Sequence, residues 1–104
     1  MTLHIYGQEL WHDPAFIVGD RESLTALAKA IEIALSRESG SASAQTMTED
    51  GEGYITFVIA RDPFPTELAL PYNDQSIVPF TGKSPYDLLS KEELHKLYHT
   101  PDVG

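Results

Sequence analysis

The segment from Tyr54 to Ala60 constrains the fold more than any other part of the chain. It is rich in aromatic and β-branched residues, which favour a strand, and it has few polar side chains on either side. Such a strand needs cover on both faces, since a strand exposed on one face alternates apolar with polar residues. Asp50-Gly51 just before it is a strong hairpin signal, because a type I′ turn needs positive φ at both central positions. We therefore predict a central strand paired with residues 44–48.

An amphipathic helix is the clearest single element. Asp20 or Ser23 can cap its first turn, and Gly40 is a natural stop because glycine adopts the left-handed conformation that ends helices. Alanines on the flank of the apolar stripe allow close packing against a sheet. The stripe has the three- and four-residue spacing of one helical face, and it consists of Leu24, Leu27, Ala28, Ile31 and Leu35. We expect this helix to bury one face of the sheet.

The remaining elements complete an α+β pattern. Two strands are expected at residues 3–7 and 15–18, and capping signatures at Ser84 and Ser90 predict a short turn followed by a helix that ends near His99. The order β-β-α-β-β-(β)-α predicts one α+β domain over residues 1–104. We expect a two-layer sandwich, with an antiparallel sheet of about four or five strands, one long amphipathic helix and a short C-terminal helix.

Residues 62–85 form a proline-rich segment that also contains large apolar residues. Disorder goes with few such residues, so we expect this segment to be ordered, with a short strand at residues 67–70. Either this segment or a second copy of the chain would cover the second face of the central strand. A homodimer or higher homo-oligomer is therefore one of two expectations.

The charge balance narrows the range of partners. Seven Lys and Arg stand against sixteen Asp and Glu, for a formal net charge of −9. This field opposes polymeric nucleic acid and anionic membranes, and it favours a basic partner protein. The absence of cysteine excludes disulfides, thiolate metal sites and cysteine nucleophiles. The sequence shows neither a signal peptide nor an apolar run of the roughly twenty residues that span a bilayer, so we expect a cytoplasmic protein.

Histidines provide the few groups that could carry chemistry. His95 and His99 lie four residues apart on the predicted helix, a spacing that can offer two nitrogens to zinc, but Lys96 stands where a zinc protease has its general-base Glu. Two histidines near a helix C-terminus also interact favourably with its negative end, and we predict no metal and no cofactor. His12 beside Asp13 could act as a general base, but no nucleophile accompanies it, and a simple turn is the preferred interpretation.

A binding site is predicted from aromatic rings with polar tips on the first and central strands. Such rings stack on planar ligands and form hydrogen bonds through their tips, although they also suit a subunit interface. The polar tip of the proline-rich segment, the loop at residues 11–14 and two nearby cations extend the set. The predicted ligand-binding residues are His4, Tyr6, Trp11, His12, Tyr54, Arg61, Tyr72, Asn73, Asp74 and Lys83.

Three functions fit these features. The first is a non-catalytic module that binds a small polar ligand, such as a nucleotide, in an aromatic and polar pocket or at an oligomer interface. The second is an acidic inhibitor or immunity-type protein that binds a basic partner protein. The third is a small enzyme that uses His12 or the His95/His99 pair. The chain has no nucleophile elbow, P-loop or zinc-protease motif, and this favours the first two.

Overall fold

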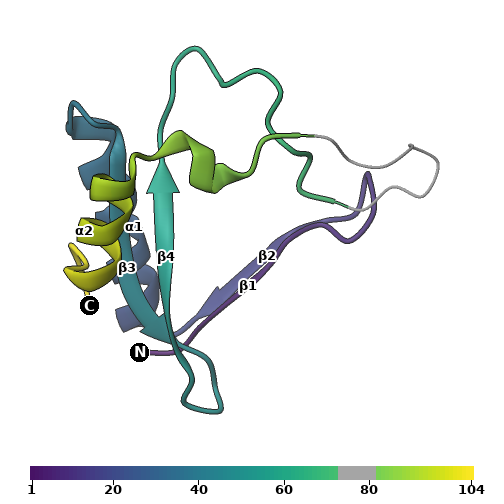
Figure 1. Cartoon of the computed structure of the whole chain (residues 1–104). Helices are drawn as coiled ribbons and strands as arrows, with labels where there is room; N and C mark the ends of the chain where they lie inside the picture. The colour runs from purple at the N-terminus through teal and green to yellow at the C-terminus, as the bar shows by residue number, and fades with distance from the viewer. Residues whose placement is uncertain (73–81) are drawn as a thin grey trace.

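The structure is a computed structural model of the chain, and it describes residues 1–72 and 82–104. Within them it is an α+β protein, as the sequence predicts, and none of its helices is long and apolar enough to cross a membrane. The elements in chain order are β1 (Leu3–Tyr6), β2 (Phe16–Gly19), α1 (Arg21–Ser36), β3 (Ser41–Met47), β4 (Gly53–Ile59), the 3-10 helix η1 (Pro85–Leu88) and α2 (Lys91–His99) (Figure 1).

The strands of the described residues form two separate antiparallel sheets, whereas the sequence predicts a single sheet of four or five strands. β1 pairs with β2, and β3 pairs with β4. A single bridge between Thr2 and Met47 connects the two hairpins at their base. Beyond this bridge the first hairpin diverges from β4, so the two hairpins cannot pair along their length (Figure 1).

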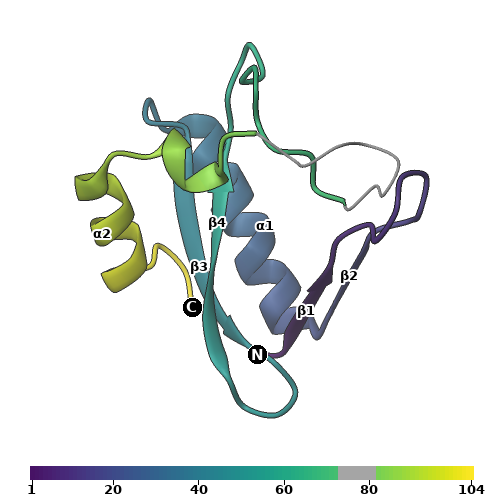
Figure 2. The same cartoon turned by 45° about the vertical axis from the view of Figure 1, so that its right-hand side comes forward.

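The β3–β4 hairpin is the centre of the molecule, with one helix on each side (Figure 2). On one face, Ala42 and Ala44 of β3 pack against Ala30 and Ala34 of α1, and all four are buried. On the other face, the Ser43 hydroxyl donates a hydrogen bond to the carbonyl oxygen of Leu97 in α2 at 2.7 Å. β3 is therefore covered on both faces by the same chain, whereas β4 is half-buried.

The buried face of α1 is mainly its alanine face, and of the predicted leucine stripe only Leu27 is buried. Leu24, Ile31 and Leu35 are 39%, 42% and 72% exposed. The reason is steric: Ala42 and Ala44 present a shallow surface, and a helix reaches close packing on it only through equally short side chains. The larger residues are displaced to the flank of the helix.

The first hairpin and its loop form an extension, residues 3–19, which we call the arm. Its base is held by the start of α1. The Ser23 hydroxyl donates to the Thr2 carbonyl oxygen at 2.6 Å, and Asp20 accepts hydrogen bonds from the backbone N–H groups of Thr2 and Ser23. Asp20 is thus the N-cap of α1, as the sequence predicts. These contacts fix the direction in which the arm leaves the body.

The C-terminal elements follow their capping signals. Ser84 caps η1 and forms a reciprocal capping box with Asp87. Ser90 accepts a hydrogen bond from the Glu93 N–H, and α2 ends at His99. The strand predicted at residues 67–70 is not formed. One isolated parallel bridge between Leu68 and Lys83 stands in its place.

The described part of the proline-rich segment packs against its own chain. Pro65 and Leu68 line a small cavity together with Phe57 and Ile59 of β4. Of the two expected covers for β4, the segment therefore supplies one, over the end of the strand.

Candidate functional site

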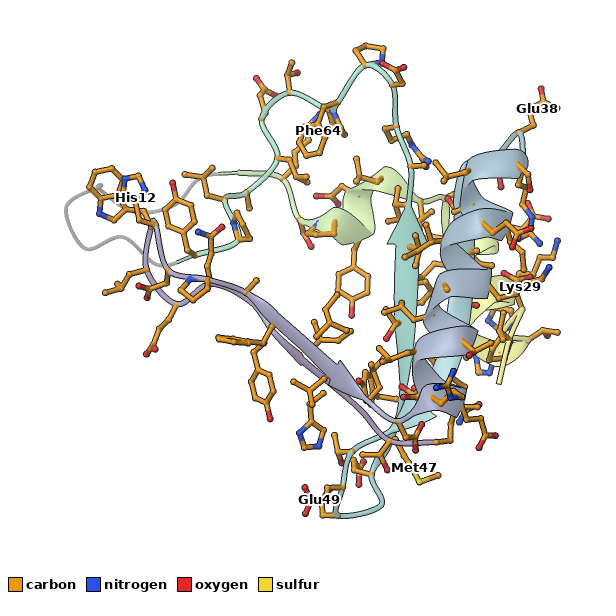
Figure 3. All side chains as sticks on the ribbon, turned by 180° about the vertical axis from the view of Figure 1, so that it is seen from behind. His12, Lys29, Glu38, Met47, Glu49 and Phe64 are labelled. Carbon is orange, nitrogen blue, oxygen red and sulfur yellow. The ribbon has the colours of Figure 1, made fainter. Side chains whose placement is uncertain are left out.

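A wide groove of about 730 Å³ lies at the base of the arm, where β1 approaches the turn between β3 and β4. We call it the acidic groove. Figure 3 shows Glu49 in this turn, beside the base of the arm. The lining residues come from the arm and from the β3–β4 hairpin, and they are Leu3, His4, Ile5, Tyr6, Thr48, Glu49, Asp50, Glu52 and Tyr54.

His4 uses both of its ring nitrogens in the acidic groove, one to join the arm to the β3–β4 turn and one to contact Tyr6 on its own strand. Nε2 accepts a hydrogen bond from the backbone N–H of Glu49 at 3.1 Å, and Nδ1 lies 2.7 Å from the Tyr6 hydroxyl. A ring nitrogen that accepts carries no proton, so the neutral ring has its proton on Nδ1 and donates it to the Tyr6 oxygen. The Tyr6 O–H is then free to donate a hydrogen bond into the groove.

Tyr54 has a different role from Tyr6. Its hydroxyl donates to the carbonyl oxygen of Leu3 at 2.6 Å and so helps to attach the arm to β4. The hydroxyl is therefore already used, and only the ring of Tyr54 is available to a ligand in the groove. Tyr54 stays a predicted ligand contact through its aromatic face.

The rim of the groove is negatively charged. Glu49, Asp50 and Glu52 line it, and none of the described residues in the lining is Lys or Arg. The hydroxyl of Thr48 donates to Asp50, and this bond, with that from the Glu52 N–H, holds the pKa of Asp50 below its ordinary value. A carboxylate ionised at neutral pH repels phosphate and attracts cations and hydrogen-bond donors.

The structure brings His4, Tyr6 and Tyr54 together, and it leaves other predicted site residues elsewhere. Trp11 and His12 lie in the loop at the far end of the arm, with ring centroids 4.1 Å apart (Figure 3). Tyr72 is at the end of the first described range and does not line the groove. Asn73 and Asp74 lie outside the described residues. The predicted set is therefore spread over the molecule.

The two predicted cations also lie away from the acidic groove. The Arg61 guanidinium donates to backbone carbonyl oxygens, including those of Gly40 at 3.2 Å and Leu88 at 3.0 Å. It thereby holds the end of β4 to η1. Lys83 is exposed and lies 4.0 Å from the Glu67 carboxylate. Neither residue is placed to bind an anion in this groove.

The rings of His95 and His99 lie side by side on α2, tilted by 48° with their centroids 4.3 Å apart. In the part of the chain that the structure describes, no group of three or more His, Asp or Glu side chains is arranged to hold a metal ion. The pair lies at the C-terminal end of the helix, where positive charge interacts favourably with the helix dipole.

The acidic half of the groove was missing from the predicted site. Sequence reasoning assigns Glu49, Asp50 and Glu52 to a turn, which they do form, because the turn signal is local. The three acidic residues close together at one hairpin tip are the sequence feature that could have pointed to this half of the groove. Comparison of the chain with protein-family models, curated proteins and solved structures gives no match, so the function has to be inferred from the groove itself.

Proposed function

We propose that the protein is a non-catalytic binding module for a small planar ligand that carries hydrogen-bond donors or a positive charge. The observation that carries this proposal is the juxtaposition in one groove of the fixed His4–Tyr6 pair and a rim of carboxylates. Aromatic walls with a few placed polar groups are typical of small-molecule sites.

Each part of the groove has a distinct task in this proposal. Leu3 and Ile5 supply apolar surface, and the Tyr54 ring offers a face for stacking. The Tyr6 hydroxyl donates a hydrogen bond to the ligand, and the carboxylates of the rim accept donors from it. Within the broader expectation of a nucleotide-type ligand, this favours the base or nucleoside over its phosphates. The phosphates would lie against the carboxylates without a cation among the described lining residues.

Thermal unfolding with a ligand panel tests the proposal. The panel contains nucleosides, the matching monophosphates and aromatic amines such as tryptamine. A ligand that binds only the folded state stabilises it, by about 2.7 kcal/mol at a hundred times its dissociation constant. We expect nucleosides or amines to raise the melting temperature. A larger rise with monophosphates than with nucleosides would contradict the proposed role of the rim.

Two variants locate the site. Tyr6→Phe removes the hydroxyl that faces the ligand, and Asp50→Asn removes one rim charge. Each should weaken binding of the best panel compound about five- to tenfold, the effect of about 1 kcal/mol for one hydrogen bond. Tyr98→Phe, which removes the hydroxyl of an exposed tyrosine on α2, is the matched control and should bind normally.

A basic protein is the second candidate partner, in keeping with an acidic inhibitor. The observation that favours it is the exposed acidic turn of Glu49, Asp50 and Glu52 on a chain of net charge −9. Such binding should weaken steeply with salt and should be lost in Glu49→Gln/Glu52→Gln. It should be insensitive to Tyr6→Phe, which separates the two candidates.

A further inference from the structure

The arm is apolar on both of its faces. Ile5, Tyr6, Phe16, Ile17 and Val18 are all 45–56% exposed. Successive residues of a strand point to opposite faces, so exposure of adjacent residues means that neither face is covered. A lone two-stranded hairpin is marginally stable at best in water.

β4 has an open edge toward the arm. The Ala60 N–H donates to the Gly40 carbonyl at the end of the β3–β4 ladder, and bonded residues alternate along an antiparallel pair. The backbone groups of Ile55, Phe57 and Ile59 therefore point away from β3. Within residues 1–72 and 82–104 no backbone group is hydrogen-bonded to them. An open edge of this kind is a template for another strand.

An apolar cavity lies beside this edge, on the α2 side of the sheet. A strand added to β4 would place alternate side chains over it, which is the usual geometry of strand addition. The cavity measures about 240 Å³, and it is lined by Phe57, Ile59, Pro85, Tyr86, Leu89 and Leu94.

The exposed flank of α1 also faces the space between the arm and β4. Figure 3 shows Lys29 on the side of α1 that faces away from the arm. At 3.6 residues per turn, Leu24, Ile31 and Leu35 are rotated by about 120–160° from Lys29, toward the arm. Exposed apolar residues of the arm and of α1, together with the open edge of the half-buried strand β4, therefore border the same space.

The exposed area is larger than a free monomer of this size requires. The accessible surface is 7628 Å². A compact monomer of this mass exposes about 5,800 Å², so the excess is about 1,800 Å². Each subunit of a permanent dimer buries about 1,000–2,500 Å², and the excess falls in this range.

Charge selects the partner. The strands of the arm and β4 contain no Asp, Glu, Lys or Arg, so contact between copies at these strands buries none of their side chains as an unpaired charge. The same lack of charge gives a basic protein nothing to recognise there. Each chain carries both the apolar arm and the open edge of β4. A two-fold axis can therefore bring the arm of each copy against the β4 edge of the other.

We propose that two copies of this chain form a homodimer by exchanging their arms. Each arm lies along the open edge of β4 in the partner, against the exposed flank of its α1. This inference is argued from observations other than the acidic groove, although Ile5 and Tyr6 belong both to the exposed surface of the arm and to the lining of the groove.

Disulfide trapping tests the position of the arm, since the chain has no cysteine of its own. A chain with Ile17→Cys is mixed with a differently tagged chain with Ile55→Cys under mild oxidation. We expect a cross-linked heterodimer, and none when Ile17→Cys is mixed with Thr25→Cys, which is exposed on the outer side of α1. Cross-linking that occurs only within one chain carrying both cysteines would overturn the exchange, as would no cross-linking at all.

Sedimentation equilibrium tests the surface itself. We expect a dimer at about 10 μM, within the range of stable complexes. Ile17→Glu and Ile31→Glu should each raise the dissociation constant at least about tenfold, and Thr25→Glu, with the same change of charge, should not. Circular dichroism checks that each variant keeps its helices.

A wild-type chain that is monomeric at this concentration would overturn the proposal, and so would a dimer that neither substitution weakens. Ile17 and Ile31 do not line the acidic groove, so either failure leaves the proposed ligand site untouched.

Discussion

At the scale of single residues, an ion pair joins the C-terminal tail to the body. Arg37, the C-cap of α1, donates to both carboxylate oxygens of Asp102 at 3.0 and 3.2 Å. The Ser43 N–H donates to the same carboxylate at 3.1 Å. The Asp102 side chain is only 17% exposed, and bidentate contacts of this kind are stronger than single ones.

The same carboxylate predicts how stability depends on pH. Desolvation raises the pKa of Asp102, but the hydrogen bonds from Arg37 and Ser43 outweigh it, and the pKa lies below its ordinary value. A carboxyl group with a lowered folded-state pKa stabilises the protein above its unfolded pKa of about 4. That contribution is lost as the pH falls through the folded-state pKa.

We therefore expect the free energy of unfolding in urea to fall in acid, below about pH 4. Asp102→Asn should already be less stable at neutral pH, by about 1–2 kcal/mol, and should lose less on acidification. Asp20 and Asp50 also have lowered pKa values, so the variant keeps part of the acid response. Identical pH dependence in the two proteins would contradict a role for Asp102.

At the scale of elements, the choice of helix face is a matter of side-chain size. The periodicity of α1 is compatible with two adjacent faces, one mostly of alanines that also carries Leu27, and one that carries Leu24, Ile31 and Leu35. The sheet beneath α1 presents alanines. The alanine face of the helix is the buried one because short side chains allow the helix to approach the sheet more closely. Sequence periodicity identifies the helix but does not rank these two faces.

Enlarging one alanine on each face tests this packing. Ala30→Leu places a large side chain between α1 and β3, where Ala30 is fully buried, and should cost about 1–3 kcal/mol. Ala28→Leu makes the same change at an exposed position and should alter stability by less than about 0.5 kcal/mol. Urea denaturation compares them. Equal losses would mean that the alanine face is not the close-packed one.

At the scale of the whole molecule, the chain is expanded. Its radius of gyration is 14.6 Å, whereas a compact chain of this length has a value of about 12.8 Å. The arm and β4 diverge from a common base (Figure 1). The shape agrees with the proposal that a second copy completes the apolar contacts.

A dimer predicts that stability depends on protein concentration. When unfolding releases two chains, a tenfold increase in concentration raises the midpoint of thermal unfolding by about 3 °C for a dimer of this size. Ile17→Glu should abolish this dependence. Scanning calorimetry or circular dichroism at several concentrations measures it. A midpoint that does not change with concentration would contradict the exchange of arms.

The candidate site shows where sequence reasoning reaches its limit. The sequence predicts a common patch of His4, Tyr6 and Tyr54 only if the faces of the first and central strands coincide, and in the structure the three residues line one groove. The contact between His4 and Glu49 joins residues 45 positions apart, and no local sequence pattern predicts it. Arg61 was predicted as a ligand contact from its position near the proline-rich segment, but its guanidinium binds carbonyl groups of its own chain.

The sequence by itself determined the local elements of this protein: the helix capped by Asp20, the hairpin between β3 and β4, and the serine caps of the last two helical segments. These depend on backbone and side-chain groups a few residues apart. The predicted type I′ turn is wrong in type, because φ is positive at Gly51 but not at Asp50. Only the tertiary structure decided which face of α1 is buried, that the strands form two sheets, and that the acidic turn borders the rings. Those outcomes depend on shape and distance between segments far apart in the chain, which no local pattern contains.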